Sequence, residues 1–189
     1  MNEKSPRERL LESANALLYE KGYDTVSVNE IIEASNTHKA SFYRYFASKD
    51  ELGILYLRSQ GAQIQEGWVG LMQKTPSPEK FIELWVSLLK RQVRSGKFFG
   101  CPLARFMSSE SKPTQSTNIA KEILESWKQT LEEYFETYKK TNILPSQFPS
   151  KEKAEKLLKI YQANSQFYVM TRDSKYFDEM KEEMLLELR

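Results

Sequence analysis

The sequence predicts an all-α protein of about nine helices, and three observations favour this fold class. Seven Gly and seven Pro in 189 residues are too few for the many tight turns of a β-sandwich or barrel. Apolar residues recur at spacings of three and four along almost the whole chain, whereas no alternating run of Val, Ile and Thr indicates a sheet. Three Ser-x-x-Glu capping boxes, which mark helix N-termini, fall within the first third of the chain.

The first predicted helix begins at Pro6. Ser5 precedes it as the N-cap, and Glu8 completes the first capping box. Gly22 is expected to end the helix, because glycine accepts a left-handed backbone that other residues resist. The helix is predicted to bury one apolar stripe, formed by Leu10, Leu11, Ala14, Leu17 and Leu18.

Two short helices are predicted next. The second capping box, Ser27-Val28-Asn29-Glu30, starts the first of them. Asn36 then stands where the chain must turn, and asparagine tolerates a left-handed conformation better than most residues. The other short helix is expected over residues 39–45, with Phe42 and Phe46 as its inward anchors.

The rest of the chain is predicted to form six more helices. The first of them starts at the third capping box, Ser48-Lys49-Asp50-Glu51, and extends toward Met72. The other five are expected at residues 78–95, 102–107, 119–138, 151–169 and 176–188. We expect the apolar face of helix 78–95 to include Phe81, Leu84, Trp85, Leu88 and Leu89, and that of helix 119–138 to include Leu124.

Composition excludes several classes of protein. A mean hydropathy of −0.62 and the lack of an apolar run of about 18 residues exclude a spanning helix, and Met1–Arg9 lacks the apolar stretch of a secretory signal. A single cysteine, Cys101, forbids an internal disulfide, so a reducing cytoplasm is the expected compartment. With one histidine and one cysteine we expect no structural metal site and no cofactor. Because the net charge is only +2, any contact with nucleic acid must depend on local charge.

Such a local charge occurs in residues 36–49. This segment, NTHKASFYRYFASK, carries three basic residues and no acidic one, whereas residues 1–35 carry four basic and seven acidic residues. Two short helices joined by a tight turn have helix-turn-helix proportions. A cationic strip on an otherwise acidic small domain is the pattern that a surface facing DNA phosphates needs.

Side-chain size and chemistry select candidate contacts within this strip. Ala40 and Ser41 are small enough for a helix to enter a major groove. His38, Lys39 and Tyr43 can reach base edges or phosphates, and Lys49 lies in the first turn of the next helix. The residues alone also allow a plainer reading, in which a solvated basic helix covers a hydrophobic hairpin and binds nothing.

Residues 6 to about 57 resemble the N-terminal domain of TetR/AcrR-type bacterial transcriptional regulators. The matching run is Glu20-Lys21-Gly22-Tyr23, then Ser27-Val28-x-x-Ile31-Ile32-x-Ala34, then Lys39-Ala40-Ser41-Phe42-Tyr43-x-Tyr45-Phe46-x-Ser48-Lys49-Asp50-Glu51-Leu52. The resemblance implies contacts to double-stranded operator DNA by Ser27, Asn29, Lys39, Ala40, Ser41, Tyr43, Tyr45 and Lys49. His38 occupies a position that varies in the family, and Asn36 and Ala40 stand where the family most often has glycine.

The resemblance implies two domains. Residues 1–49 would bind DNA, and residues 50–189 would bind a small-molecule inducer and form a homodimer through the last two helices. The dimer would bury apolar residues of these helices, namely Leu157, Leu158, Tyr161, Phe167, Tyr168, Phe177, Met180, Met184 and Leu185. The inducer pocket would be lined by Trp85, Phe98, Phe99, Cys101, Phe106, Met107, Trp127, Tyr134 and Phe167, for which ordinary core packing is the alternative.

Cys101 carries a separate hypothesis. It immediately precedes a predicted short helix that begins at Pro102, and Lys97 and Arg105 are close in sequence, so we expect a lowered thiol pKa. The run Gly100-Cys101-Pro102-Leu103 resembles a branch of the family whose cysteine senses electrophiles. An inert core thiol is the alternative.

Two other function classes predict different properties. An enzyme needs a nucleophile with a base, yet the only histidine is far along the chain from Cys101, so we expect no enzyme. The acidic pairs Glu132-Glu133 and Glu182-Glu183 point apart on a helix and form no catalytic dyad. A helical scaffold or membrane-surface protein would bind nucleic acid weakly and without sequence preference.

Overall fold

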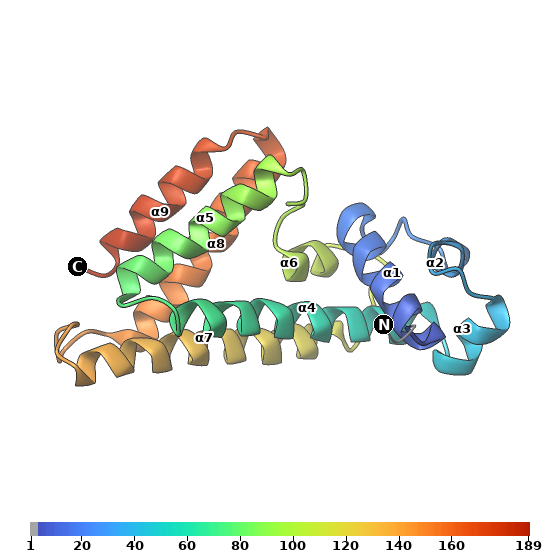
Figure 1. Ribbon diagram of the computed structural model, residues 1–189, viewed down its shortest axis with the longest axis horizontal. Helices are drawn as coiled ribbons and strands as arrows, with labels where there is room; N and C mark the ends of the chain where they lie inside the picture. Colours follow the sequence, from blue (N-terminus) through green and yellow to red (C-terminus); the bar gives the residue numbers. More distant parts are fainter. Residues whose placement is uncertain (1–3) are drawn as a thin grey trace. The chain divides into compact units, whose positions relative to one another are not determined.

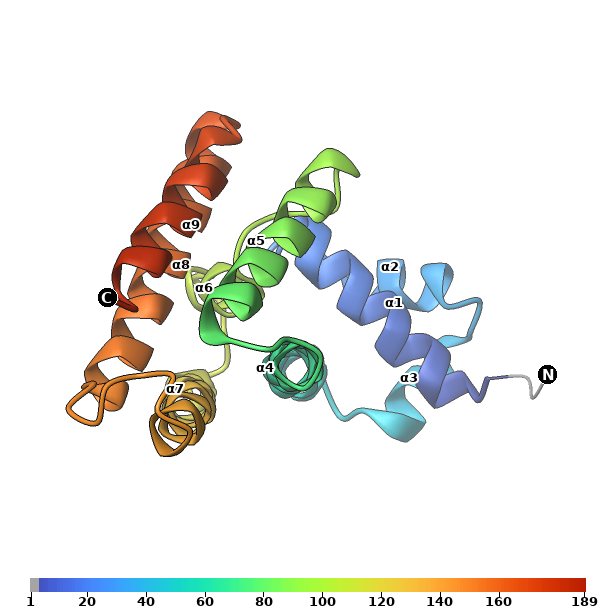
Figure 2. The same ribbon diagram turned by 60° about the vertical axis from the view of Figure 1, so that its left-hand side comes forward.

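The computed structural model describes residues 4–189, and within them every regular element is an α-helix (Figures 1 and 2). The predicted all-α class and the number of helices are confirmed for this part of the chain. The helices are α1 (Pro6–Lys21), α2 (Val28–Ala34), α3 (Lys39–Tyr45), α4 (Lys49–Met72), α5 (Pro78–Arg94), α6 (Pro102–Met107), α7 (Ser116–Lys140), α8 (Ser150–Thr171) and α9 (Lys175–Leu186).

The first helix starts and ends as its sequence predicts. The Ser5 hydroxyl accepts a hydrogen bond from the Glu8 backbone N–H, and the Glu8 carboxylate accepts one from the Ser5 backbone N–H. Gly22 ends α1 with a φ of 90°. The buried stripe is narrower than predicted, because Leu11 and Leu17 are only partly buried.

The second capping box is only half formed. Ser27 caps α2 by accepting a hydrogen bond from the Glu30 backbone N–H. The Glu30 carboxylate does not complete the box, because it pairs with the Lys21 ammonium at the end of α1. At the third start, Ser48 accepts from the Glu51 N–H and the Glu51 carboxylate accepts from the Ala47 N–H.

Three leucines assigned to buried faces are in fact at the surface. Leu84 and Leu88 on α5 are 37 % and 38 % exposed, and Leu124 on α7 is also exposed. The buried row of α5 contains the predicted Phe81, Trp85 and Leu89, together with Ile82 and Val86. Positions three or four apart share a face, so Leu84 and Leu88 lie together beside that row.

Two compact units make up the chain. One contains the described chain through Ala62 together with Pro102–Lys121, and the other contains Gln63–Cys101 together with Glu122–Arg189. In the first unit α1 packs against α2, α3 and α6, and in the second α9 packs against α8 and α5 (Figure 2). The predicted functional boundary at residue 49 stays a prediction.

The core of the second unit is aromatic. The ring of Trp68 meets those of Trp85 and Trp127 at centroid distances of 4.9 and 5.4 Å. All three tryptophans are buried.

Across residues 4–189, no helix combines the length and apolar composition needed to cross a bilayer. The same residues bring together no group of three or more His, Cys, Asp or Glu that could hold a metal ion.

Gly53 on α4 gives a stability prediction for the first unit. A Cβ at this position would lie 2.6 Å from Cε2 of the buried Tyr23 ring and 3.2 Å from the Phe106 ring. We expect Gly53→Ala to lower the free energy of unfolding by about 1–3 kcal/mol through overpacking. A Cβ at Gly67 on the same helix would meet nothing within 4 Å, so Gly67→Ala is the control and should stabilise by about 0.5–1 kcal/mol. Urea unfolding measures both, and equal effects would contradict the prediction.

Candidate nucleic-acid interface

A tight turn joins α2 to α3. Asn36 adopts a φ of 48°, as its position in the sequence predicts. Its backbone N–H donates to the Glu33 carbonyl, and that of Thr37 donates to the Ile32 carbonyl. The hydroxyls of Ser35 and Thr37 lie 2.8 Å apart within hydrogen-bonding distance. These bonds fix the direction in which α3 leaves the turn.

Arg9 ties this turn to α1. Its Nε donates to the Ser35 carbonyl at 3.1 Å, and its Nη2 donates to the Asn36 carbonyl at 3.4 Å. These carbonyls belong to the end of α2 and the turn, where no intrahelical donor reaches them. One guanidinium thus holds the turn against the first helix.

The two sides of α3 differ sharply. Phe42 and Phe46 are fully buried, and their ring centroids lie 5.7 Å apart. Tyr43 faces outward with 52 % of its surface exposed. The structure leaves the other predicted contacts exposed or partly exposed, namely Ser27, Asn29, His38, Lys39, Ala40, Ser41, Tyr45 and Lys49. Sequence-predicted residues from α2, α3 and the start of α4 are therefore solvent-accessible in one small unit.

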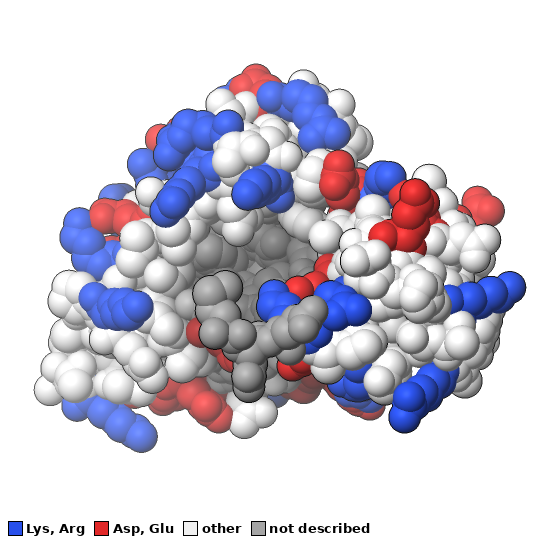
Figure 3. All heavy atoms as spheres, turned by 45° about the vertical axis from the view of Figure 1, so that its right-hand side comes forward, with Lys and Arg blue, Asp and Glu red and all other residues white. Residues whose placement is uncertain are grey.

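The outer side of α3 carries positive charge. Lys39 and Arg44 are exposed, and the Arg44 guanidinium lies 5.8 Å from the Tyr45 ring centroid. No acidic residue occurs between Glu33 and Asp50. Elsewhere on the face shown in Figure 3 both basic and acidic side chains occur, and the net charge of the whole chain is only +2. The positive character is thus local to this segment.

Lys49 is held in a defined position at the first residue of α4. Its Nζ donates to the Tyr23 carbonyl at 2.6 Å and lies 4.3 Å from the centroid of the Tyr23 ring. Partial burial lowers the pKa of Lys49, and the nearby carboxylates of Asp24 and Asp50 oppose that shift. The ammonium is neither fully buried nor freely extended into solvent.

Tyr23 is itself fixed by its surroundings. It is 2 % exposed, and its hydroxyl donates to Oδ1 of Asp50 at 2.7 Å. The rings of Tyr23 and Phe106 meet edge to face at 4.9 Å. Burial, followed by the Asp50 carboxylate, raises the pKa of the Tyr23 hydroxyl well above its usual range. The phenol therefore stays protonated and keeps donating to Asp50.

Asp24 ties the loop after α6 to the end of α1. Its carboxylate accepts hydrogen bonds from the backbone N–H groups of Glu110 and Ser111 at 2.9 and 3.1 Å, and from the Ser111 hydroxyl. The Arg105 guanidinium adds a bond to the Glu20 carbonyl at 2.9 Å. The Ser111 hydroxyl, with the backbone donors, lowers the pKa of Asp24 below its ordinary 3.8.

The lowered pKa of Asp24 predicts a pH dependence. The folded protein holds the charged carboxylate more tightly than the unfolded chain does, so the stabilisation is complete above about pH 4. It is lost as the pH falls through the lowered pKa. We expect Asp24→Asn to lower the free energy of unfolding at pH 7. The difference in this free energy between the variant and the wild type should narrow toward pH 3. Urea unfolding at several pH values measures this difference in the free energy of unfolding, and a difference that does not change with pH would contradict the prediction.

The residues predicted to line an inducer pocket fall into separate clusters. Phe106 and Met107 belong to the first unit. Within the second unit, Trp85, Trp127 and Tyr134 belong to a buried aromatic cluster that also contains Phe81. Elsewhere in that unit, Phe98 packs against Tyr168 and Phe177, and Phe99 is partly buried.

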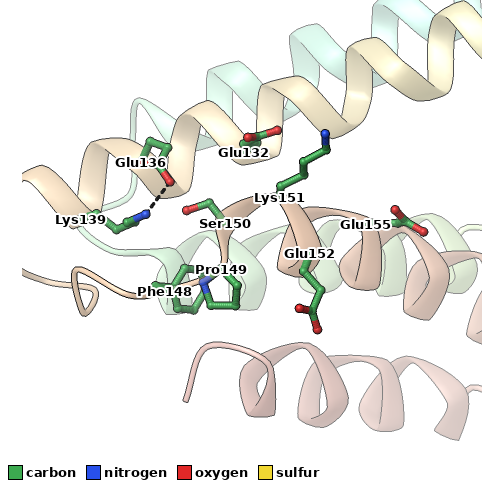
Figure 4. A pocket seen from close by; sticks show the side chains of 9 residues that line it. All are labelled: Glu132, Glu136, Lys139, Phe148, Pro149, Ser150, Lys151, Glu152 and Glu155. Carbon is green, nitrogen blue, oxygen red and sulfur yellow. Dashed lines mark hydrogen bonds and ion pairs between the residues drawn. The ribbon is translucent and has the colours of Figure 1, made fainter.

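Phe167, which was also predicted to line the pocket, lies at the surface. It is 47 % exposed, and its ring stacks on that of Tyr176 at 5.2 Å. Two surface grooves of about 510 and 420 Å³ are lined by none of the predicted pocket residues. The larger contains polar side chains of α7 and α8 around Phe148 and Pro149 (Figure 4).

Cys101 is buried in the second unit. The side-chain Nε2 of Gln162 on α8 lies 3.0 Å from the Cys101 sulfur, to which it donates. Cys101 is 3 % exposed and directly precedes α6. The thiol thus contacts a helix that was predicted to form the dimer.

Most of the apolar residues predicted for a dimer interface are used inside the protomer. Leu157, Leu158, Tyr161, Tyr168, Phe177, Met180 and Met184 are buried in the second unit. The large number of apolar residues on α8 and α9 therefore does not argue for a dimer, because α9 already packs against α8 and α5. The large apolar residues exposed on these helices are Phe167, Met170 and Leu186.

Three residues of the candidate interface were not among the contacts predicted from the sequence. Arg44 lies in the acid-free run, and that position was a sufficient signal for including it. Arg9 and Tyr23 act through backbone carbonyls and a ring contact more than 20 residues away in sequence. No local pattern in the chain signals either contact.

Comparison with known proteins identifies the N-terminal part of the chain. Residues 10–53 match the profile of bacterial regulatory proteins of the tetR family. An HTH-type transcriptional regulator of Lactococcus lactis is 26 % identical over 108 residues, which are 56 % of this chain and 55 % of that protein. The transcriptional repressor NemR of Escherichia coli is 25 % identical over 101 residues, 52 % of this chain and 51 % of NemR. The match thus spans about half the length of these relatives.

Solved structures share the fold of the whole chain. Reduced E. coli NemR superimposes with a TM-score of 0.84 at 16 % identity, covering 98 % of both chains. A TetR transcriptional regulator from Legionella pneumophila superimposes with a TM-score of 0.83 at 22 % identity, covering all of both chains. At these identities the likeness concerns the fold alone.

Proposed function

Because the chain belongs to the TetR family of bacterial transcriptional regulators, on the match of residues 10–53, we propose that it is a homodimeric cytoplasmic repressor released from a palindromic operator by a small molecule. The observation that carries this proposal is the difference between the buried side and the exposed side of α3. One side anchors the helix through Phe42 and Phe46, and the other presents Lys39 and Tyr43 within a segment that has no acidic residue between Glu33 and Asp50.

The exposed residues have distinct roles in the proposed complex. Ala40 and Ser41 let α3 approach the floor of the major groove, while Lys39 and His38 reach base edges or phosphates. The hydroxyls of Tyr43 and Tyr45 and the ammonium of Lys49 bind the phosphate backbone. At the start of α2, Ser27 and Asn29 contact the backbone on the other side of the groove.

An exposed apolar row on α8 supports the homodimer. Ile160, Ala163, Phe167 and Met170 follow a 3-4-3 spacing, the pattern that packs one helix against another. Ile160 is partly exposed and the other three are exposed, with Met170 at 61 %. Leu186 of α9 is also exposed. A two-fold axis beside α8 would bury these side chains in a four-helix bundle and present two copies of α3 to two half-sites.

An inducer would act by its preference for one conformation. A ligand that binds the DNA-free conformer more tightly by about 2–3 kcal/mol shifts occupancy of the operator markedly. The aromatic cluster around Trp85 and Trp127 supports an apolar ligand, which would have to open a site among packed rings.

An electrophile acting at Cys101 is the second candidate inducer. Its contact with Gln162 supports this route, because an adduct on the buried sulfur would displace a side chain of α8. We expect Cys101→Ser to bind operator DNA normally and to resist release by a quinone. Anisotropy of labelled operator DNA measures the release, and equal release from both proteins would exclude the route.

A gel-shift titration on the promoter DNA beside the protein's own gene tests the proposed function. The repressor predicts tight binding that competitor DNA of unrelated sequence does not abolish, and at least a tenfold loss for Tyr43→Ala. An enzyme predicts no shift, and a scaffold protein predicts weak binding without sequence preference or loss on this substitution. Either outcome would overturn the proposal.

A further inference from the structure

The Lys49 ammonium has more N–H donors than its hydrogen bond to the Tyr23 carbonyl uses. A lysine ammonium carries three N–H donors. The bond to the Tyr23 carbonyl, at 2.6 Å, uses one of them. The side chain is partly exposed at the N-terminus of α4, five residues after the outward-facing Arg44. The ammonium can therefore keep its contact with Tyr23 and still donate to a phosphate oxygen.

Tyr23, which holds Lys49, is itself fixed in position. The Tyr23 ring lies 4.3 Å below the ammonium and is fixed by the hydroxyl bond to Asp50 and by the edge of the Phe106 ring. Gly53 lets the ring lie close to α4, because a Cβ there would overlap it. A flexible lysine loses considerable side-chain entropy when it binds, and a ring and carbonyl that already confine it reduce that loss.

We propose that Tyr23 is the positioning residue for Lys49 in DNA binding. Its ring and backbone carbonyl confine the ammonium at the edge of the interface, so that the phosphate contact forms on a side chain already in place. This inference rests on the proposed function. Removing the ring should weaken DNA binding about two- to fivefold for each half-site, the range expected for a cation–π contact at a partly exposed position.

The test measures how DNA affinity depends on salt, with a labelled duplex of random sequence as the probe. The logarithm of the affinity falls with the logarithm of the salt concentration by about 0.9 for each phosphate contact. With two copies of Lys49 in a dimer, Lys49→Met should reduce this slope by about 1.8. A loss of folded protein lowers the apparent affinity at every salt concentration alike and leaves the slope unchanged.

Three further variants separate positioning from a structural role. Tyr23→Leu should keep the wild-type slope, because the phosphate contact still forms, but should lower the affinity about two- to fivefold for each half-site, whereas Tyr23→Phe, which keeps the ring, should bind as wild type does. In the double variant, Tyr23→Leu should add nothing to Lys49→Met. A folded Tyr23→Leu protein with wild-type affinity, or a further loss of affinity in the double variant beyond that of Lys49→Met, would overturn the inference. Wild-type protein that binds no duplex would overturn the proposed function as well.

A measurement on the wild-type protein covers the case in which Tyr23→Leu fails to fold. The Tyr23 ring should shift the Lys49 Hε proton resonances upfield in the free protein. We expect the shift to persist when the random-sequence duplex is bound. Its disappearance on binding would show that Lys49 leaves Tyr23 to reach the phosphate, which contradicts positioning.

Discussion

Replacing Ala40 by Glu is expected to reduce affinity for operator DNA at least 100-fold while leaving the stability of the protein unchanged. Ala40 is exposed in the first turn of α3, where a carboxylate is compatible with the helix dipole. In the complex the same carboxylate would enter the groove as both added bulk and a negative charge. Juxtaposed like charges cost several kcal/mol at an interface, and the dimer would place two of them there.

Fluorescence anisotropy with labelled promoter DNA measures this loss, and thermal unfolding measures stability. Ala62→Glu is the matched control, because Ala62 is also an exposed helical alanine but lies on α4 outside the acid-free segment. It should bind DNA within about threefold of wild type. An Ala40→Glu protein that binds as the control does would show that α3 does not enter the groove.

Introducing charge into the exposed row of α8 is expected to separate the dimer. Phe167→Glu, combined with Met170→Glu, would place carboxylates opposite their own symmetry mates in an apolar seam. We expect the dimer dissociation constant to rise at least 100-fold, because large apolar side chains at the centre of an interface dominate its stability. Operator affinity should fall as well, since two unlinked protomers no longer bind both half-sites as one unit.

Sedimentation velocity across a range of concentrations measures the dissociation. Leu84→Glu is the control, because Leu84 is a similarly exposed leucine on α5 of the same unit. It should leave the dimer intact. If the double variant sediments as wild type does, the dimer is not built on this face of α8.

The helix starts could be predicted from sequence because their causes are local. Ser5, Ser27, Ser48 and Ser77 each accept a hydrogen bond from the residue three positions later. The positive φ of Asn36 likewise follows from its own side chain and its neighbours. Interactions that span the chain gave no such signal. The bond from Ser111 to Asp24 joins residues 87 positions apart, and it was found only in the structure.

Side-chain type alone could not separate a pocket from a packed core. Trp127 and Phe167 are both large and aromatic, yet the first is fully buried among other rings and the second is at the surface. The same limit explains Leu84 and Leu88, which share the helical spacing of buried residues but face solvent. For α3 the sequence was more informative, because the outward positions differ from Phe42 and Phe46 in size, polarity and charge.

Methylation-protection footprinting on the promoter DNA beside the protein's own gene tests the central claim most directly. The claim is that paired copies of α3 read the major groove. We expect protection of guanine N7 atoms in two symmetry-related half-sites about 34–36 Å apart or a multiple of that spacing, with the protection lost for Ala40→Glu. Protection of one unsymmetrical site, or none that depends on sequence, would contradict it.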